Sequence, residues 1–283
     1  MNLKKYKSHF IEQIELLYDA EEAESFFYLI LEKLHQMKRI DLALNPAFEI
    51  SDFDIEKWNL IVSDLEIYKP IQYILGETEF FGLKFSVDSN TLIPRPETEE
   101  LVALILKICN AKKIENPKTL DIGTGSGCIA ISLAKNLSNA KVFGLDVSEK
   151  ALQIAETNAK LNQVEVDFIL QNILEVDDLT QQFDIIVSNP PYVRNLEKHE
   201  ISKNVLDYEP HLALFVEDND ALLFYRKIAL LAQKNLSENG LLFFEINQYL
   251  GKETMELVQK LNFKNIQLKQ DVYGNDRMIL CEK

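Results

Sequence analysis

Cysteine, glycine and proline are all scarce in this sequence of 283 residues. Nine glycines and eight prolines are too few for a collagen-like or low-complexity chain. Cys109, Cys128 and Cys281 lie far apart, and no pair has the spacing of a zinc ligand set or of a CxxC redox motif. We therefore expect no metal site. An odd number of cysteines without a disulfide framework is typical of a reducing cytoplasm.

Basic side chains are also in deficit, since 30 Lys and Arg residues stand against 45 Asp and Glu residues and give a formal net charge of −15. Duplex DNA and anionic membranes attract clustered Lys and Arg, so this charge argues against both as bulk partners, although it leaves room for a local basic groove. No apolar run approaches 18 residues. Glu12 and Glu15 interrupt the stretch that would have to be the apolar part of a signal peptide. We expect a cytoplasmic monomer without a membrane partner.

What is present is the composition of an ordinary globular protein, 47% hydrophobic and 27% charged, with room for about two domains. In residues 1–75, apolar residues recur at three- and four-residue steps, which predicts helices with one buried face. Ser51 and Asp54 have the spacing of a capping box at the start of one such helix. The recurring apolar residues of the earlier helices are Phe10, Ile14, Leu17, Phe26, Phe27, Ile30, Leu31 and Leu34.

Acidic residues dominate this first part, with 17 acids and 9 bases in residues 1–90. Such charges usually form the solvated outer face of a helical bundle, and that is our default interpretation. The alternative is a docking surface for a partner with a basic patch.

The pattern changes at residues 76–98. Aromatic and aliphatic residues on either side of Gly82 predict a short β-hairpin. Pro94 and Pro96 then hold the backbone extended ahead of a helix at residues 99–108. The chain therefore divides into a helical domain at residues 1–75, a hairpin and linker at residues 76–98, and a third domain at residues 99–283.

Strands and helices alternate in the third domain. This alternation predicts an α/β fold with a parallel sheet, helices on both of its faces, and ligands at the carboxyl ends of its strands. The predicted strands are residues 119–122, 141–145, 164–170, 183–187, 241–246, 264–270 and 276–281. The predicted helices are residues 129–137, 149–161, 221–236 and 252–261.

A glycine-rich turn follows the first of these strands. It consists of Gly123, Thr124, Gly125, Ser126 and Gly127, and it comes two residues after Asp121. Glycines permit positive φ and let a ligand approach the backbone. The spacing GxGxG is neither the dinucleotide fingerprint, because Cys128 stands where a glycine would be needed, nor a P-loop, because no lysine follows. The alternative is that this segment is only a tight turn and binds no ligand.

The second strand ends in Asp146, about twenty residues after the glycine turn. An acid at this place can accept both hydroxyls of a ribose. The turn and Asp146 together favour nucleoside binding over a purely structural turn.

A second turn, Asn189-Pro190-Pro191-Tyr192, follows the fourth strand. The two prolines remove two backbone donors and fix two φ angles, and each restricts the residue before it to extended geometry. The side-chain oxygen of Asn189 and the carbonyl oxygen of Pro190 could then point at one spot. The alternative is that two prolines only end the strand.

Two converging acceptors suit a planar NH₂ group. Holding both hydrogens would aim the nitrogen lone pair at an electrophilic methyl group without a strong base. Tyr192 could supply a ring face that packs on the planar group. No nucleophile-and-base set competes, because His9, His35, His199 and His211 lie outside these turns, and we expect them at the surface.

The glycine turn with Asp146 resembles the class I S-adenosylmethionine-dependent methyltransferases. The Asn-Pro-Pro-Tyr turn is similar to that of enzymes that methylate a planar amino group, both N6-adenine and protein glutamine methyltransferases. Residues 93–101, IPRPETEEL, and residues 271–277, DVYGNDR, resemble one family in particular. It is the HemK/PrmC family of peptide chain release factor N5-glutamine methyltransferases, which the chain resembles over essentially its whole length.

This resemblance implies that Gly123 to Gly127 cradle S-adenosyl-L-methionine, that Asp146 holds its ribose, and that Asn172 and Ile173 lie at its adenine. It implies as substrate the glutamine of the Gly-Gly-Gln loop of release factors, and as second product S-adenosyl-L-homocysteine. The helical domain would dock the release factor. By the same resemblance, the catalytic residues are Asn189, Pro190 and Tyr192, and Asn189 also lies near the cofactor. The glutamine pocket contains Asn189, Pro190, Pro191, Tyr192, Arg95, Glu97 and Thr98. For the last three, linker capping and salt bridging are the alternative.

Two other functions stay open. One is an N6-adenine methyltransferase acting on DNA or RNA, against which the net charge of −15 argues. The other is a scaffold that binds S-adenosylmethionine without turnover. An intact Asn-Pro-Pro-Tyr turn argues against that, because a scaffold does not need paired amide acceptors.

Overall fold

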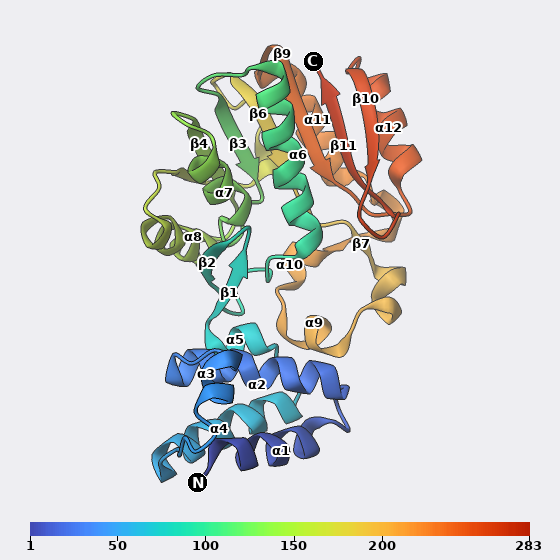
Figure 1. Cartoon of the computed structure of the whole chain (residues 1–283). Coiled ribbons are helices and arrows are strands. Elements are labelled where there is room, and N and C mark those ends of the chain that lie inside the picture. The colour runs from blue at the N-terminus through green and yellow to red at the C-terminus, as the bar shows by residue number, and fades with distance from the viewer. The chain divides into compact units, whose positions relative to one another are not determined.

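The computed structural model describes residues 1–283, which form two compact units (Figure 1). The helical unit consists of Met1–Gly76 and Lys203–Tyr208, and the sheet unit consists of Glu77–Ser202 and Glu209–Lys283. The segment Lys203–Tyr208 is helix α9, which the sequence pattern did not indicate. It belongs to the helical unit because the Tyr208 hydroxyl donates to the carbonyl of Ile67 at 2.9 Å and Lys203 lies over the ring of Tyr68.

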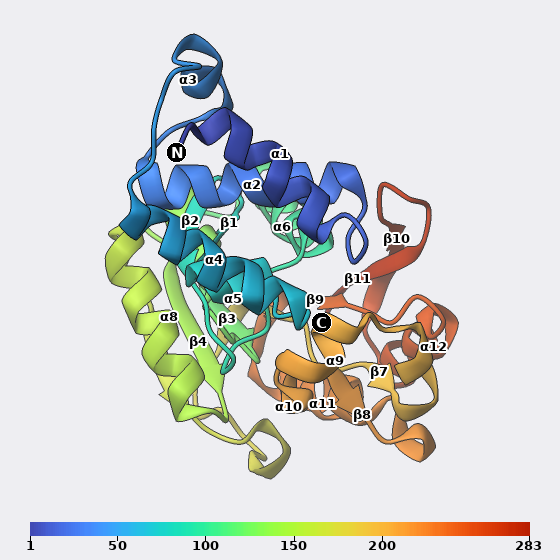
Figure 2. The same cartoon turned by 90° about the horizontal axis from the view of Figure 1, so that it is seen from below.

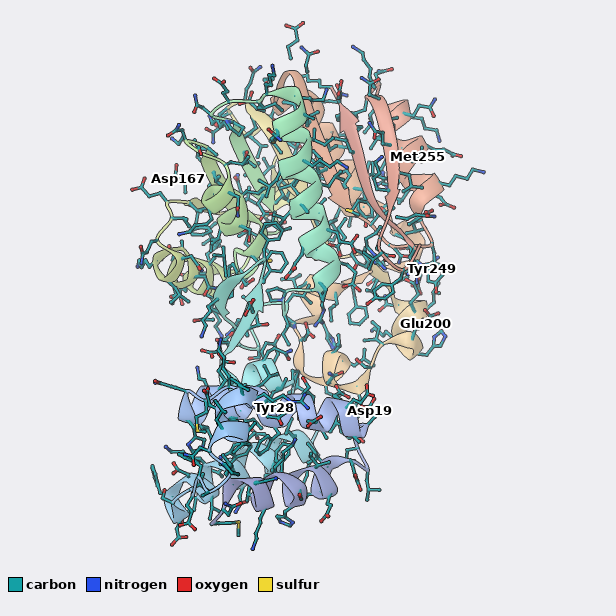
Figure 3. The ribbon with its side chains drawn as sticks, viewed as in Figure 1. Asp19, Tyr28, Asp167, Glu200, Tyr249 and Met255 are labelled. Carbon is teal, nitrogen blue, oxygen red and sulfur yellow. The ribbon has the colours of Figure 1, made fainter.

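Capping side chains mark where the long helices of the helical unit begin. Asp19, labelled in Figure 3, accepts the N–H of Glu22 at 2.8 Å. The predicted capping box is confirmed, since Ser51 and Asp54 each accept the other's backbone N–H. The helices are α1 (Leu3–Ile14), α2 (Ala20–His35), α3 (Arg39–Leu44), α4 (Asp52–Glu66), α5 (Ile71–Leu75) and α9 (Lys203–Tyr208).

The core of the helical unit is built around Trp58, which stacks on Phe27 with ring centroids 4.9 Å apart. Helices α1 and α2 pack on each other, and α1 also packs on α4 (Figure 2). His35 is half-buried rather than at the surface as expected, and its Nε2 accepts the indole N–H of Trp58 at 3.1 Å. Leu17 was also wrongly assigned to a buried face. Helix α1 ends at Ile14, and the Leu17 side chain in the following turn is 36% exposed.

A seven-stranded sheet with the order β10-β11-β9-β6-β3-β4-β5 forms the centre of the sheet unit. The α/β fold is confirmed, with one difference from the all-parallel expectation. Strand β11 runs antiparallel to both of its neighbours, while the remaining pairs are parallel. The strands are β3 (Lys118–Ile122), β4 (Lys141–Asp146), β5 (Asp167–Leu170), β6 (Phe183–Ser188), β9 (Leu236–Glu245), β10 (Lys264–Gln270) and β11 (Asp276–Glu282).

Helices cover both faces of this sheet, because successive side chains of each buried strand point to opposite sides (Figure 1). On β6, Ile185 and Val187 pack in one apolar cluster and Ile186 in the other. The first cluster includes α6 (Pro96–Lys112), α7 (Cys128–Asn136) and α8 (Glu149–Asn162). The second includes α11 (Leu223–Asn235) and α12 (Gly251–Lys260).

The predicted hairpin is present as β1 (Glu77–Phe80) and β2 (Leu83–Ser86), joined at Phe81 and Gly82, which both have positive φ. Asn158 on α8 exchanges two hydrogen bonds with the backbone of Ser86 and donates a third to the carbonyl of Ser126. One buried amide therefore connects the hairpin to the glycine turn. The remaining short elements are β7 (Val193–Arg194), β8 (Phe215–Val216), α10 (His211–Leu214), and the 3-10 helices η1 (Ile173–Glu175), η2 (Asn195–Glu200) and η3 (Asp218–Asp220).

Membrane-spanning helices were not expected from the sequence. In the structure, every helix is either too short or too polar to cross a bilayer.

Candidate functional site

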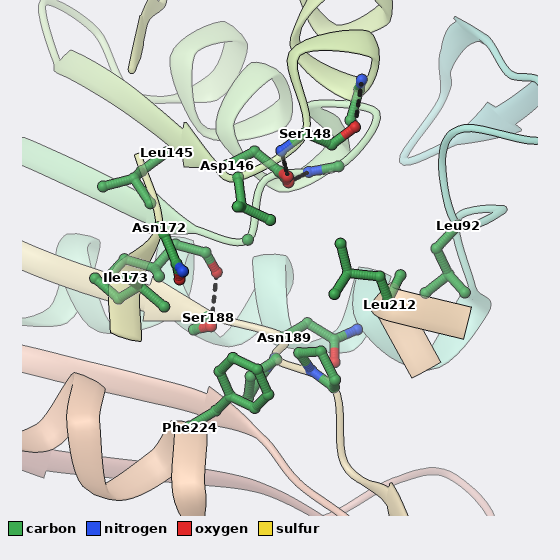
Figure 4. Close-up of a pocket in the computed structure, with 18 of the residues that line it drawn as sticks. Leu92, Leu145, Asp146, Ser148, Asn172, Ile173, Ser188, Asn189, Leu212 and Phe224 are labelled. Carbon is green, nitrogen blue, oxygen red and sulfur yellow. Dashed lines mark hydrogen bonds between the residues drawn. The ribbon is translucent and has the colours of Figure 1, made fainter. Parts of the chain in front are cut away.

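A cavity of about 250 Å³ opens where β3, β4 and β6 end, at the carboxyl edge of the sheet (Figure 4). This is the edge at which parallel α/β sheets bind ligands. Residues from both predicted turns line it together with residues that follow β4 and β5. The lining residues used below are Leu92, Gly123, Gly125, Asp146, Ser148, Asn172, Ile173, Asn189, Pro190, Pro191, Leu212 and Phe224.

The glycine turn joins β3 to α7 with three glycines at positive φ. Gly123 and Gly125 line the cavity. A Cβ on Gly125 would meet no atom within 4 Å, so the backbone is open to a ligand there. Gly127 has a different task, because a Cβ on it would lie 2.8 Å from Cδ1 of Ile131 and 3.2 Å from Cβ of Ala155. Glycine at this position therefore allows α7 to begin close to Ala155 of α8.

The two polar residues of the turn face inward, and neither lines the cavity. The Thr124 hydroxyl donates to Oδ2 of Asp121 at 2.6 Å, and Ser126 offers its carbonyl to Asn158. Asp121 is fully buried, its Oδ1 has no hydrogen-bond partner, and burial raises its pKa to about 7. The structure thus gives Thr124 and Ser126 contacts that shape the turn.

Asp146 stands at the cavity with its carboxylate held by the backbone. Oδ2 accepts the N–H of Gly125 at 2.8 Å, and Oδ1 accepts the N–H of Ser148 at 2.9 Å (Figure 4). Each carboxylate oxygen can accept a second hydrogen bond. An oriented acceptor pair is therefore available at the cavity, as a diol requires.

Asn172 and Ile173 also line the cavity, directly after β5. The Asn172 side chain begins η1, with Oδ1 accepting the N–H of Leu174 at 3.1 Å and Nδ2 donating to Glu175 at 2.9 Å. Ile173 supplies an apolar surface.

In the second turn, Asn189, Pro190 and Pro191 line the cavity. The turn lies against the glycine turn, since a Cβ on Gly123 would be 4.0 Å from the carbonyl oxygen of Asn189. Just before it, the Ser188 hydroxyl donates to the carbonyl of Ile122 at 2.6 Å and ties the ends of β6 and β3 together (Figure 4). The two turns predicted from the sequence are thus neighbours in space.

Tyr192 is not among the residues that line the cavity. Its hydroxyl donates to Oε1 of the buried Glu245 at 3.1 Å, and burial raises its pKa well above the usual value. Its backbone carbonyl accepts the side-chain N–H of Asn247 at 3.0 Å.

The linker residues Arg95, Glu97 and Thr98 do not line this cavity either. Arg95 forms an ion pair with the buried Glu209, and Glu97 lies in the first turn of α6. Thr98 is buried, donates to Oε2 of Glu245 at 2.7 Å and accepts from Nδ2 of Asn189 at 3.2 Å. Of the three, Thr98 is hydrogen-bonded to the Asn-Pro-Pro-Tyr turn.

Sequence reasoning missed two buried acids beside the site, Glu245 and Glu209. Glu245 could have been noticed as a carboxylate inside the apolar run LLFFEI, at the end of a predicted strand. Glu209 offered no such pattern. The lining residues Leu212 and Phe224 offered none either, because their position depends on how α10 and α11 pack.

Solved structures share this arrangement of the sheet. The 16S rRNA N2 G1207 methyltransferase of T. thermophilus, described in complex with AdoMet and guanosine, matches with a TM-score of 0.53 and 17% identity, over 73% of this chain and 49% of its own. A methyltransferase from Pyrococcus furiosus matches with a TM-score of 0.52 and 18% identity, over 82% of this chain and 99% of its own. The fold, with its ligand cavity at the carboxyl edge, is that of the class I methyltransferases.

Sequence comparisons narrow this class. The methyltransferase small domain family matches residues 102–211, and the PrmC N-terminal domain family matches residues 10–76. A release factor glutamine methyltransferase of Flavobacterium psychrophilum is 63% identical over 99% of this chain and 98% of its own length. Another, from Bacteroides thetaiotaomicron, is 40% identical over 99% of this chain and 100% of its own. The chain belongs to the family of release factor glutamine methyltransferases.

Proposed function

We propose that this protein transfers a methyl group from S-adenosyl-L-methionine to N5, the side-chain amide nitrogen, of the glutamine in the Gly-Gly-Gln loop of peptide chain release factors. The observation that carries the proposal is the meeting of the two turns. Asn189 and Pro190, whose oxygens are the candidate acceptors for an amide, line the same cavity as the open backbone at Gly125 and the carboxylate of Asp146.

The residues of the cavity fit the cofactor. A ribose diol suits the free lone pairs of Asp146, which the N–H groups of Gly125 and Ser148 already orient. The unfilled space over Gly125 admits a ligand to the backbone of the turn. Ile173 and Phe224 offer apolar surface for a planar base, with Asn172 beside them. When bound, S-adenosyl-L-methionine supplies the electrophilic methyl group.

The amide of a glutamine side chain is a weak nucleophile, because its nitrogen lone pair is delocalised into the carbonyl. Asn189 Oδ1 and the Pro190 carbonyl would each accept one of its two hydrogens. Both hydrogens would then be held in place, and the lone pair would be free to face the methyl group as the nitrogen becomes pyramidal. The contribution of the chain is orientation and preorganised acceptors. Methylation would make the nitrogen cationic, and one of its two hydrogens would then leave as a proton to water, so that no general base is needed before transfer.

The helical unit is the part of the chain that we assign to docking the release factor. Acids outnumber bases in residues 1–76 by 14 to 8, so that a basic protein surface would be attracted and nucleic acid repelled. The same charge argues against an N6-adenine methyltransferase, which would need a basic groove.

The experiment is to incubate the protein with S-adenosyl-L-methionine and a release factor, and to measure the mass of the peptide that contains the Gly-Gly-Gln loop. We expect a gain of one methyl group on the glutamine. Label that appeared in DNA or RNA and not in the release factor would assign the chain to the adenine methyltransferases instead. The absence of turnover with tight cofactor binding would make it a scaffold.

Asn189→Ala tests the amide grip within the same assay. It leaves one amide hydrogen of the substrate unpaired in a site shielded from water, which costs about 1–3 kcal/mol, or about 10–100-fold in rate. Asn110→Ala, at an exposed position on α6, is the matched control and should turn over at the normal rate. Undiminished turnover by Asn189→Ala would show that this side chain does not hold the substrate.

A further inference from the structure

Asn189, which is half-buried, is the last member of a chain of three hydrogen-bonded side chains. Its Nδ2 donates to Oγ1 of Thr98 at 3.2 Å, and that hydroxyl donates to Oε2 of Glu245 at 2.7 Å. Thr98 and Glu245 are buried, and they come from the first turn of α6 and the end of β9. Neither lines the cavity, and the only side chain of the cavity lining to which Thr98 is hydrogen-bonded is that of Asn189, whereas Glu245 also holds Tyr192 of the same turn.

The carboxylate of Glu245 sets the direction of this chain. An ionised carboxylate only accepts, and it receives one hydroxyl on each oxygen, Thr98 on Oε2 and Tyr192 on Oε1. Burial raises the pKa of Glu245, while the two hydroxyl donors and the positive charge of Arg277 act against that rise by favouring the ionised form. Arg277 is itself held by Asp271, with Nε and Oδ2 3.1 Å apart.

A hydroxyl has a single hydrogen, and Thr98 has given its own to Glu245. What Thr98 presents to Asn189 is therefore a lone pair, which can accept only from the NH₂ end of the Asn189 amide. The flipped amide would place Oδ1 against the Thr98 oxygen, two acceptors facing each other. The oxygen of Asn189 is thereby left for the cavity.

We propose that Glu245 and Thr98 are positioning residues that fix the orientation of the Asn189 amide, so that its oxygen rather than its NH₂ group is offered to the substrate. This inference rests on the proposed function, because orientation matters only if Asn189 holds an NH₂ group. With Asn189 flipped, its own NH₂ group would face that of the glutamine, donor against donor.

Thr98→Val is the first test, since valine has the shape of threonine and lacks the hydroxyl. We expect kcat for release-factor methylation to fall about 10-fold, with the Kd for S-adenosyl-L-methionine unchanged. Thr98→Ser, which keeps the hydroxyl, should recover most of the loss. Thr254→Val is the control, because it removes another buried threonine hydroxyl, which donates to the carbonyl of Leu250 just before α12, and it should leave kcat unchanged.

Glu245→Gln tests the direction of the chain, because the amide of glutamine can donate to Thr98 and allow the reversed arrangement. We expect a loss of kcat similar to that of Thr98→Val. Should this variant fail to fold, Thr98→Val still decides the matter.

The sharpest readout is the double variant Asn189→Ala/Thr98→Val. If Thr98 acts only through Asn189, the double variant should turn over no more slowly than Asn189→Ala alone. Additive losses would show that Thr98 acts on the substrate directly and would overturn the proposal, as would a Thr98→Val enzyme with normal kcat.

A readout independent of turnover is the side-chain NH₂ signal of Asn189 in protein labelled with ¹⁵N-asparagine. Its hydrogen exchange should be slowed in the unmodified protein and should become faster in Thr98→Val. Equal exchange in both proteins would overturn the proposal. If the unmodified enzyme methylates no release factor while this signal behaves as expected, the proposed function fails and the fixed orientation of Asn189 stands.

Discussion

At the scale of single residues, Asp146 is held by the protein before any ligand arrives. Each of its carboxylate oxygens already accepts one backbone N–H, from Gly125 and from Ser148. We expect Asp146→Asn to weaken S-adenosyl-L-methionine binding about 10–100-fold, since the new NH₂ group must face one of these two donors and a charge-assisted hydrogen bond of about 1.5–3 kcal/mol is lost.

Isothermal titration calorimetry with S-adenosyl-L-methionine measures this effect. Asp167→Asn is the matched control, because Asp167 is also an acid on a strand of the sheet, but its side chain is 60% exposed, 3.6 Å from Lys141. Its affinity should equal that of the unchanged protein. An unaltered affinity in Asp146→Asn would remove Asp146 from the cofactor site.

The residues that the sequence indicated are those whose task is local. Gly125 and Asn189 belong to short motifs that specify their own backbone shape, and both line the cavity. The role of Glu245 could not be predicted, because its partners Thr98 and Tyr192 are 147 and 53 residues away along the chain. Only the folded sheet brings these three side chains together.

At the scale of elements, one ion pair joins the linker before α6 to the segment before α10. The Glu209 side chain is 1% exposed, and it accepts from the guanidinium of Arg95 and from the N–H of Ile93. Arg95 is 32% exposed, so the two partners are not equivalent. The flanking residues Leu92 and Leu212 both line the cavity, which makes this pair a support for its rim (Figure 4).

Removing the two charges in turn should therefore have unequal effects on stability. Arg95→Met leaves a buried carboxylate with one backbone donor, and we expect it to lower the free energy of unfolding by about 3 kcal/mol. Glu209→Gln leaves a guanidinium that water can reach, and about 1 kcal/mol should be lost.

Urea denaturation of the two variants and of the double variant measures the difference. Arg39→Met is the control, since Arg39 is 71% exposed and lies 3.6 Å from Glu24, and its stability should stay within 0.5 kcal/mol of the unchanged protein. A larger loss in Glu209→Gln than in Arg95→Met would contradict this account.

Helices and strands could be predicted where residues at their ends, such as glycines, mark the boundary in the sequence. The run from β3 through the glycine turn to α7 was found, because the apolar strand and the glycines adjoin in sequence. Strand β9 begins at Leu236 rather than at residue 241, with an irregular register against β6 near Asp184 that no local pattern marks. Helix α9 contains no buried residue, so its sequence has no apolar stripe to detect.

At the scale of the whole molecule, the alternation of strands and helices predicted the class of fold but not the order of the strands. Strand β11 enters between β9 and β10 and runs against both. Its buried stretch from Met278 to Cys281 is a continuous apolar run, which would suit either direction. The direction is decided by the short hairpin from β10, which forces the chain to reverse.

Burial of one acid in the middle of the sheet should give the stability of the entire fold a pH dependence. Asp121 lies near the end of the interior strand β3, with one oxygen unpartnered, and burial raises its pKa from the usual 3.8 to about 7. A carboxyl group whose pKa is higher in the folded than in the unfolded state favours folding only while it stays protonated. Its contribution is complete below about pH 4, is lost as the pH rises from there to about 7, and does not change further at higher pH.

Asp121→Asn abolishes this titration, and the amide oxygen can still accept the Thr124 hydroxyl that Asp121 accepts now. The unfolding free energy of the variant minus that of the unchanged protein should therefore increase by about 3 kcal/mol from pH 5 to pH 8, as a pKa shift of this size implies. Other carboxyl groups titrate equally in both proteins, so their effects cancel when the two unfolding free energies are subtracted at each pH. Urea titrations at pH 5, 6, 7 and 8 give this difference directly. A difference that stays constant over the range would mean that Asp121 ionises in the folded protein as easily as in water, and that some buried group not yet recognised compensates its charge.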